Sequence, residues 1–319
     1  MLDIVIPTYN RLNYLKKTIK SVIHNRLDNI VNLIVFDNGS NDDTQNWLTE
    51  FECIYKFKYI RSESNIGIID SWNLCKDLGT NKYVMLLHDD DLLTDKYLNR
   101  IVDFIKNNND CAIIHTGANI IDENGVILNQ KIKKYPKILS GLDYFRKHIN
   151  GKAGFICPSV VYNRELIPKY IYFNPKTPFT LDVVYFLECT RYGNVGYIAE
   201  PLFNYRVHST SASSSIFDRL AVKMEDRKHH FIFLKNEILK RIGENKQYLA
   251  KDYYYQALSA DIWFYSLSMT NIKYINLLVL IVKLVKFERK LIFKRCFWIN
   301  IVKAIIPKSI INLIRKING

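Results

Sequence analysis

The sequence has no hydrophobic segment long enough to cross a membrane, and it is poor in proline and glycine. Its longest mainly apolar run covers residues 275–282 and ends at Lys283, well short of the ~20 residues that span a bilayer. Twelve glycines and eight prolines in 319 residues exclude collagen-like and low-complexity chains. There is also no Gly-Lys-Ser/Thr loop, which excludes a P-loop nucleotide site.

The six cysteines are scattered, with no Cys-x-x-Cys pair and no metal-ligand spacing. In a chain of this size, that distribution predicts reduced thiols and an intracellular setting. The first residues, Met-Leu-Asp-Ile-Val-Ile-Pro, lack a basic segment followed by an apolar one, so we expect no secretory signal. We therefore expect a cytoplasmic protein.

Positive charge is concentrated at one end of the chain. Residues 1–215 hold 25 basic and 23 acidic side chains, whereas residues 216–319 hold 20 basic and 8 acidic ones. Such a basic tail is typical of binding to a polyanionic surface, either anionic lipid or nucleic acid. Because no groove-entering motif is present, we expect no nucleic acid partner.

Short apolar runs alternate with amphipathic segments in the first half of the chain. Strands are expected at residues 4–6, 33–36, 59–60, 83–87 and 112–115, and helices beginning near residues 12, 44, 68 and 98. This order predicts a parallel sheet with helices on both faces. Later features are a hairpin about Asn124-Gly125, a helix capped by Ser140, a strand over 155–162 that is broken by Pro158, a helix over 182–192 and a strand over 197–205.

Polar clusters follow three of these strands. They are Pro7-Thr8-Tyr9-Asn10, Asp37-Asn38-Gly39-Ser40 and His88-Asp89-Asp90-Asp91. Ligands of open α/β sheets lie beyond the carboxyl ends of the strands, so the clusters should meet there. Three adjacent carboxylates repel one another unless a cation such as Mg²⁺ or Mn²⁺ is bound. The alternative is a solvated loop in which one aspartate caps the next helix.

Taken in order, these motifs together with Asn65-x-Gly67 resemble the family 2 glycosyltransferases of the GT-A fold. The resemblance covers about residues 2–215. It implies an α/β fold of GT-A (Rossmann-like) type, with a mixed, mainly parallel sheet and flanking helices. The implied GT-A domain spans residues 1–215, with a nucleotide half to about 117 and an acceptor half over 118–215. The charge and spacing of the remaining residues predict a mainly helical basic C-terminal extension over 216–319.

The resemblance also assigns residues to the nucleotide-sugar and to a divalent cation, Mn²⁺ or Mg²⁺. The donor contacts fall on Pro7, Thr8, Tyr9, Arg11, Asp37, Asn38, Asn65, Gly67, Asp89 and Arg206, and the metal ligands on Asp90, Asp89 and His208. His88 stands at the first acidic place of the family's Asp-x-Asp motif, and Asp91 would be a supporting acid or a cap. Asn38 replaces an acid in the base-binding turn and accepts hydrogen bonds only through its carbonyl oxygen. The donor that the resemblance favours is a UDP- or dTDP-sugar.

A further carboxylate must act as the base in inverting sugar transfer, because the acceptor hydroxyl loses its proton as it attacks the anomeric carbon. The segment Thr180-Leu181-Asp182 resembles the family's catalytic segment, which makes Asp182 the base. The alternative is that Asp182 only caps its helix, a common role for aspartate.

Four lysines in the tail recur at steps of three and four, namely Lys283, Lys286, Lys290 and Lys294. This spacing predicts one side of a single helix. Residues 273–319 carry 11 basic side chains and one acidic side chain, which favours a peripheral position on an anionic membrane surface, at the inner face of the cell membrane. The apolar face could instead pack on the body or on a partner chain.

These patterns together predict an inverting, metal-dependent glycosyltransferase. It would move a sugar from a nucleotide donor to a glycan or lipid-linked acceptor in bacterial-type surface polysaccharide synthesis. One alternative is a nucleotidyltransferase, which would carry a glycine-rich basic loop after the first strand, where Tyr9-Asn10-Arg11 stands here. Another is a catalytically decayed nucleotide-sugar-binding scaffold, since His88 and Asn38 occupy usually acidic places.

Overall fold

The computed structural model describes residues 1–25, 30–208, 220–268, 281–282, 284–285 and 288–305. The chain divides into two compact units, Met1–Ser209 and Thr210–Gly319. Lys283, Lys286 and the serine-rich segment 209–215 lie outside the described residues. No described helix combines the length and apolar character that crossing a bilayer requires.

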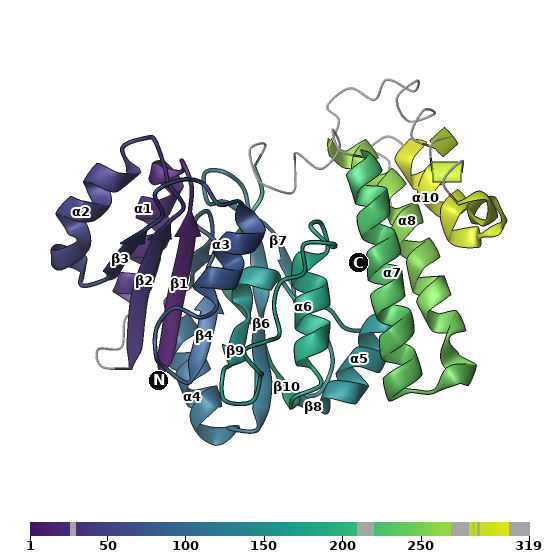
Figure 1. Cartoon of the computed structure of the whole chain (residues 1–319), viewed down its shortest axis with the longest axis horizontal. Helices are drawn as coiled ribbons and strands as arrows, with labels where there is room; N and C mark the ends of the chain where they lie inside the picture. Colours follow the sequence, from purple (N-terminus) through teal and green to yellow (C-terminus); the bar gives the residue numbers. More distant parts are fainter. Residues whose placement is uncertain (26–29, 209–219, 269–280, 283, 286–287, 306–319) are drawn as a thin grey trace. The chain divides into compact units, whose positions relative to one another are not determined.

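The first unit begins with alternating strands and helices (Figure 1). These are β1 (Leu2–Thr8), α1 (Leu12–His24), β2 (Val31–Asp37), α2 (Thr44–Tyr55), β3 (Lys58–Arg61), α3 (Ile68–Cys75), β4 (Tyr83–Leu86), β5 (Leu92–Leu93) and α4 (Tyr97–Asn107). The second half contains β6 (Cys111–Ile121), β7 (Ile127–Lys131), β8 (Ile138–Leu139), α5 (Gly141–Ile149), η1 (Cys157–Ser159), β9 (Val161–Asn163), α6 (Leu181–Cys189) and β10 (Asn194–Arg206).

All these strands belong to one mixed sheet in the described part of the chain, in the order β3-β2-β1-β4-β9-β6-β10-β5. Strands β1 to β4 run parallel, as do β6 and β10, whereas β9 lies antiparallel between β4 and β6. Strands β7 and β8 pair antiparallel with β6 and β10. The expected mixed, mainly parallel sheet with flanking helices is confirmed.

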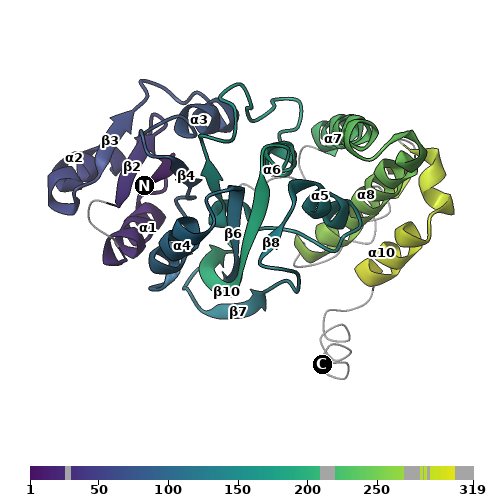
Figure 2. The ribbon, with the colours of Figure 1, turned by 90° about the horizontal axis from the view of Figure 1, so that it is seen from below.

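Helices cover both faces of this sheet. Figure 2 shows α1 and α4 on one face and α3 and α6 on the other. Leu15, Ile19 and Val22 of α1, at helical spacing, are fully buried in one cluster with Leu98 and Ile101 of α4. Burial of both faces of the sheet explains why its strands are continuous apolar runs without alternation.

The strand expected over residues 155–162 is interrupted at Pro158, as predicted, but only its last part forms a strand. Cys157–Ser159 forms a 3₁₀ turn with Pro158 in its first positions, and the strand β9 begins only at Val161. Proline has a fixed φ and no N–H to offer a neighbouring strand, so it begins a helical turn more readily than it continues a strand.

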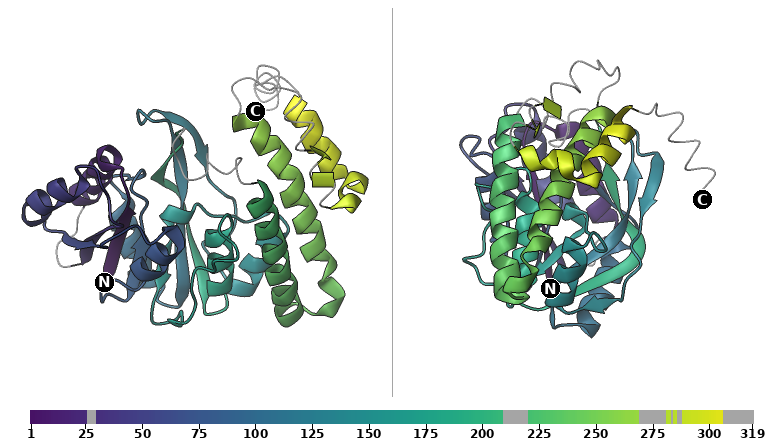
Figure 3. Two further views of the ribbon diagram at one scale, coloured as in Figure 1. Left: turned by 45° about the horizontal axis from the view of Figure 1, so that its top comes forward. Right: turned by 90° about the vertical axis from the view of Figure 1, so that its right-hand side faces the viewer.

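The described residues of the second unit are mainly helical. They form α7 (Leu220–Arg241), α8 (Tyr248–Ser268), α10 (Arg295–Ile305) and short 3₁₀ turns at Glu244–Lys246 and Arg289–Phe293. Figure 3 shows α8 between α7 and α10. The expectation of one continuous helix through Lys290 and Lys294 is wrong. The Glu288 side chain accepts a hydrogen bond from the Lys290 N–H and starts the second 3₁₀ turn, which ends before α10.

The core of the first unit contains a buried histidine whose titration should affect stability. His115 of β6 is fully buried, and its Nε2 lies 2.9 Å from the Tyr135 hydroxyl. Burial lowers the pKa of this imidazole to about 3, so below the ordinary pKa of ~6.5 only the unfolded chain takes up its proton. Stability from this group is full above pH ~6.5 and is lost as the pH falls, by about 2 kcal/mol at pH 5.

We therefore expect His115→Phe to lose less stability than the parent between pH 7 and pH 5. Urea unfolding at the two pH values measures the difference. His24→Gln is the matched control, because His24 is exposed at the end of α1. An unaltered pH dependence in His115→Phe would show that the residue does not contribute.

Candidate active site

The carboxyl ends of β1, β2 and β4 meet at one edge of the sheet. The Thr8 hydroxyl donates a 2.8 Å hydrogen bond to Asp89, and the Asn38 N–H donates one of 2.9 Å to the Thr8 carbonyl. The three polar clusters expected to converge are therefore in contact. Pro7 lies inside β1 opposite Phe36, and Tyr9 follows β1 with 39% of its surface exposed.

Arg11 connects the first cluster to the acids that follow β4. Its Nη1 lies 3.2 Å from Asp89 Oδ1 and 2.9 Å from Asp90 Oδ2. Burial alone would lower the pKa of Arg11, but Asp89 and Asp90 raise it above its ordinary value. A guanidinium cation thus stands directly beside the acidic run.

The three acids after β4 are buried together, with exposures of 5% for Asp89, 8% for Asp90 and 1% for Asp91. Burial raises the pKa of Asp89 to about 6, although Arg11 and the Thr8 hydrogen bond act in the opposite direction. Burial, and then the charge of Asp90, raise the pKa of Asp91 well above its ordinary value. Adjacent buried acids of this kind are typical of cation sites, because a bound cation removes their repulsion.

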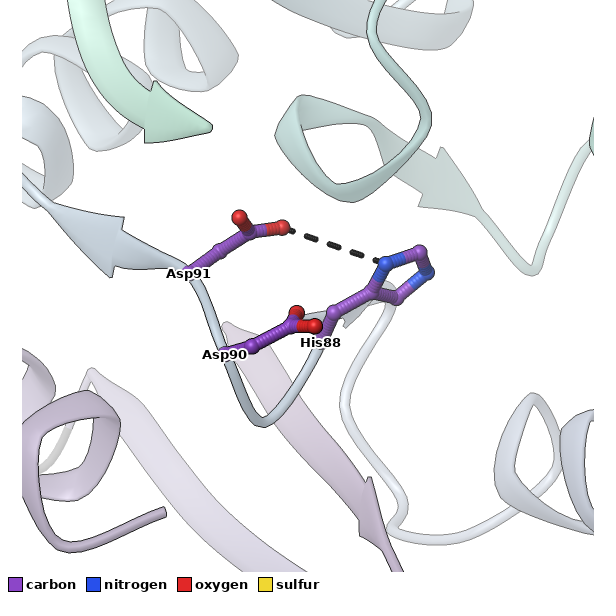
Figure 4. A group of neighbouring side chains, drawn as sticks. All are labelled: His88, Asp90 and Asp91. Carbon is purple, nitrogen blue, oxygen red and sulfur yellow. Dashed lines mark ion pairs between the residues drawn. The ribbon is translucent and has the colours of Figure 1, made fainter. Parts of the chain in front are cut away.

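Within the described residues, His88, Asp90 and Asp91 form a group that fits a metal ion. One ligand atom from each lies within 4.8 Å of the others. Figure 4 shows His88 and Asp91 facing each other, with His88 Nδ1 and Asp91 Oδ2 3.9 Å apart. Asp91 Oδ2 is buried and lacks a hydrogen-bond partner, and such an orphaned atom is what a cation would satisfy.

The protonation state of His88 is compatible with metal binding. Burial lowers its pKa to about 4, with the charge of Asp90 acting in the opposite direction. The imidazole is therefore neutral at pH 7, and a neutral imidazole is the form that ligates metals. Carboxylate oxygens with imidazole nitrogen suit Mn²⁺, and carboxylates with water suit Mg²⁺.

His208, which follows the end of β10, contacts the Asp90 carboxylate. Its Nε2 lies 3.0 Å from Asp90 Oδ2, its side chain is 1% exposed, and its ring packs against Tyr14 with centroids 4.7 Å apart. Of the three expected ligands, Asp90 and His208 are therefore in contact. Asp89 instead points to Thr8 and Arg11. Metal ligation by the three stays a prediction.

Arg206 has a positioning role that its sequence motif does not reveal. It is 3% exposed, and its guanidinium donates to the backbone carbonyls of Asp90, Asp122 and Glu123, while its N–H donates to Asp91. These bonds fix the acidic loop to the turn between β6 and β7. The diphosphate contact expected for Arg206 stays a prediction, and it would be made by a side chain already engaged in these bonds.

The turn after β2 is also internally bonded. Asp37 is fully buried and accepts from the Ser40 N–H, the Tyr59 hydroxyl and the Arg61 guanidinium. Gly39 has φ +74°, and a Cβ there would lie 2.6 Å from the Ser64 backbone. Only glycine fits this position, which holds the turn against the loop that contains Asn65.

Asn38 joins the two loops through its amide. Its oxygen accepts from the Ile66 N–H at 3.0 Å, and its nitrogen donates to the Asn65 side chain at 3.1 Å. The Gly67 N–H in turn donates to Asn65. The amide thus donates and accepts at once, which a carboxylate in this place could not do.

Asp182 lies in the first turn of α6 and is half-buried. The N-cap of this helix is Thr180, so the alternative of Asp182 as the cap is wrong. Asp91 does not cap α4 either, because Lys96 precedes that helix. Neither acid is therefore the N-cap residue of a helix.

Cys157 links the Asp182 carboxylate to the acidic loop. Burial, then the charge of Asp182, then that of Asp91, raise the pKa of this thiol well above its ordinary value. One sulfur atom therefore lies within electrostatic range of both carboxylates. The sequence predicted that the segment Gly154–Ser159 lines the acceptor side, but it gave Cys157 no role of its own. It also left His88 and Asp91 out of the metal group, although both stand in the acidic motif.

The chain is similar to known proteins both in sequence and in fold. The family model described as Glycosyl transferase family 2 matches residues 3–171, more than half of the 319-residue chain. An uncharacterised glycosyltransferase of Methanocaldococcus jannaschii is 25% identical over 271 residues, covering 84% of this chain and 86% of the relative. A putative teichuronic acid biosynthesis glycosyltransferase of Bacillus subtilis is 25% identical over 217 residues, covering 67% and 82%.

Two solved structures share the fold. TarS of S. aureus (residues 1–349), in complex with UDP-GlcNAc, has a TM-score of 0.65 at 16% identity and covers 90% of this chain and 81% of its own. A mannosyltransferase of Pyrobaculum calidifontis, in complex with GDP-Man and Mn²⁺, has a TM-score of 0.53 at 12% identity and covers 95% and 85%. At these identities the likeness shows the fold alone, and it confirms the expected GT-A architecture.

Proposed function

The chain belongs to glycosyl transferase family 2, and from that premise we propose that it transfers a sugar with inversion from a nucleotide-sugar donor to a glycan or lipid-linked acceptor. The observation that carries the proposal is the pair of separate acidic centres near Cys157. The acids after β4 are grouped as a cation site requires, while Asp182 stands apart on α6. Inverting transfer needs both a base and charge neutralisation of the leaving diphosphate.

In this mechanism Asp182 accepts the proton of the acceptor hydroxyl at a carboxylate oxygen as that hydroxyl attacks the anomeric carbon. Thr8, Arg11, Asn65, Gly67 and the other assigned donor contacts hold the nucleotide at the strand ends, and Arg11 offers a guanidinium to the diphosphate. Mn²⁺ or Mg²⁺, held by Asp90 with His208 and the neighbouring Asp89, His88 or Asp91, would supply the countercharge for the diphosphate.

The donor in this proposal is a UDP- or dTDP-sugar. The TarS complex contains UDP-GlcNAc. This supports a uridine nucleotide as the donor, although the 16% sequence identity to TarS by itself shows only a shared fold. Titration calorimetry of the full chain against UDP, dTDP, GDP and CDP, with and without Mn²⁺, tests it. Binding of UDP or dTDP that requires Mn²⁺ is the expected result, and a preference for GDP or CDP would refute the base assignment while leaving the reaction class open.

The two alternatives are less well supported. A nucleotidyltransferase is disfavoured because α1 starts at Leu12, immediately after the first cluster, which leaves no room for a glycine-rich basic loop. A decayed scaffold is disfavoured because the two substituted places have chemical uses. His88 offers an unpartnered neutral nitrogen, and Asn38 joins the two loops at the nucleotide end of the sheet.

We propose that the acceptor is a precursor of a cell-surface polymer, bound by the half of the GT-A domain over residues 118–215. The relative named for teichuronic acid biosynthesis supports this class of acceptor. We also propose that the basic region over 216–319 holds the enzyme at the inner membrane face. In its described part, α10 buries Phe297 and Ile301 and leaves Trp298 55% exposed, while Phe293 just before it is 82% exposed.

Two substitutions on this exposed face should weaken membrane binding. Phe293→Ser with Trp298→Ser removes two exposed aromatic rings without substituting the buried side of α10, which packs on α8. Aromatic side chains at a bilayer interface contribute apolar area, so we expect about a tenfold loss in sedimentation with phosphatidylglycerol vesicles. Ile232→Ser on α7, where Ile232 is 51% exposed, is the control. Unchanged sedimentation of the double variant would remove this face from membrane binding.

A further inference from the structure

The hairpin formed by β6 and β7 exposes an unusual amount of apolar surface. Val126 is 59% exposed, Ile127 56%, Leu128 61% and Ile132 42%. Every residue from Glu123 to Lys134 is exposed. Three consecutive apolar residues left in solvent on an edge strand are a typical sign of an interaction surface.

The same segment is strongly basic. Residues 124–142 contain Lys131, Lys133, Lys134 and Lys137, and they contain no aspartate or glutamate. The rest of the first unit does not share this bias, because residues 1–215 hold 25 basic and 23 acidic side chains. We name as the β7 surface the seven exposed residues Val126, Ile127, Leu128, Lys131, Ile132, Lys133 and Lys134.

The β7 surface is held in shape by its own hydrogen bonds. Asp122 accepts from the Asn124 and Val126 N–H groups at 2.9 Å each, and β7 pairs with β6 from Ile127 to Lys131. The Lys133 N–H donates to the Tyr197 hydroxyl at 2.7 Å. A surface that is already ordered loses little conformational entropy when it binds.

The hairpin is also tied to the acidic loop. Arg206 donates to the carbonyls of Asp122 and Glu123 at the hairpin turn and to the carbonyl of Asp90. The Arg206 side chain thus connects the turn of the hairpin to the backbone of the candidate metal loop. Figure 2 draws β7 at the margin of the sheet of the first unit.

The chemistry of the surface selects among three occupants. A second copy of the chain pairing edge to edge would bring the lysines of two β7 strands together, which repels. A soluble polyanion would satisfy the lysines but would leave Val126, Ile127 and Leu128 in water. An anionic bilayer satisfies both, because apolar side chains enter the interface while lysines remain among the headgroups.

We propose that the β7 surface docks on an anionic lipid bilayer. This contact belongs to the first unit and is separate from the basic C-terminal region. It does not depend on the proposed reaction, since it concerns where the enzyme lies rather than what it transfers.

Insertion is tested directly with Leu128→Trp in the full chain and vesicles whose lipids carry brominated acyl chains, which quench a nearby indole. We expect the indole at position 128 to add fluorescence to that of the parent protein. Brominated vesicles that contain phosphatidylglycerol should quench this added fluorescence. The control is Ile54→Trp, because Ile54 of α2 is 64% exposed in the same unit. The local readout separates this surface from the C-terminal region, which would recruit both variants equally. Absence of extra quenching at position 128 would overturn the proposal.

The charge requirement is tested with Lys131→Gln, Lys133→Gln and Lys134→Gln combined. Each lysine near an anionic surface contributes about fivefold in affinity, so vesicle binding should weaken by about 10²-fold. The control variant carries Lys106→Gln, Lys152→Gln and Lys169→Gln, which remove the same charge at exposed positions elsewhere. Equal binding of the two variants would overturn the proposal.

The rival occupants have their own signatures. A dimer in light scattering that Leu128→Asp converts to a monomer would assign the surface to a second copy. Tight binding of soluble polyphosphate, lost in the lysine variant, without quenching by lipid would assign it to a polyanion. Either result would replace the bilayer. Nucleotide binding measured by calorimetry should stay unchanged in all these variants, because none of them substitutes an assigned donor contact, which keeps this test separate from that of the reaction.

Discussion

Asp182→Asn should lower the rate of sugar transfer by about 10³-fold, the range expected when a general base is removed. Asparagine keeps the size of the side chain but does not accept a proton. Asp182 is not the cap of α6, whose N-cap is Thr180, so the substitution does not remove a helix cap. The Mn²⁺-dependent affinity for the nucleotide should stay within a few-fold of the parent, because the acids after β4 are untouched.

The measurement is single-turnover transfer together with calorimetry of nucleotide binding. Glu188→Gln, on the same helix and also half-buried, is the matched control and should transfer normally. If Asp182→Asn turned over at the parental rate, Asp182 would have no part in the proton transfer. If it lost nucleotide affinity as well, the residue would belong to the donor site and the base would have to be another group.

Much of the donor half could be predicted from the sequence because its signals are local. The apolar spacing of Leu15, Ile19 and Val22 fixes the buried face of α1, and a continuous apolar run followed by acids marks the end of β4. The order of parallel strands then brings those ends together without any knowledge of side-chain contacts. The hairpin about Asn124-Gly125 was predictable for the same reason, since a turn is encoded in adjacent residues.

The features that were missed depend on partners far apart in the chain. β9 has only three residues, too few to show a period, and its antiparallel place between β4 and β6 follows from tertiary pairing. The bonds of Arg206 to Asp90 and Asp122 span 116 and 84 positions. The lysine spacing in the tail predicted one continuous helix. This prediction failed because a periodic pattern of charges does not reveal a break such as the 3₁₀ turn that Glu288 starts.

Asp90→Asn should abolish the effect of Mn²⁺ on nucleotide binding and lower turnover by about 10²- to 10³-fold. Asp90 contacts both Arg11 and His208, at 2.9 and 3.0 Å, and it belongs to the group with His88 and Asp91. A cation held there offsets several kcal/mol of charge on a leaving diphosphate, and an amide oxygen binds it far less strongly than a carboxylate. Folding should be retained, because the substitution also relieves repulsion among three buried acids.

Three measurements decide the role of Asp90. Calorimetry with and without Mn²⁺ gives the coupling between metal and nucleotide, turnover gives the catalytic loss, and thermal unfolding confirms that the variant is folded. Asp95→Asn is the control, because Asp95 is exposed on the same connection between β4 and α4. A parental Mn²⁺ response in Asp90→Asn would move the metal away from this carboxylate. If the parent protein bound the nucleotide equally well without Mn²⁺, the proposed metal dependence would be refuted, whereas the assignment to the family would be unaffected. Arg11 would then be the positive charge that lies beside the diphosphate.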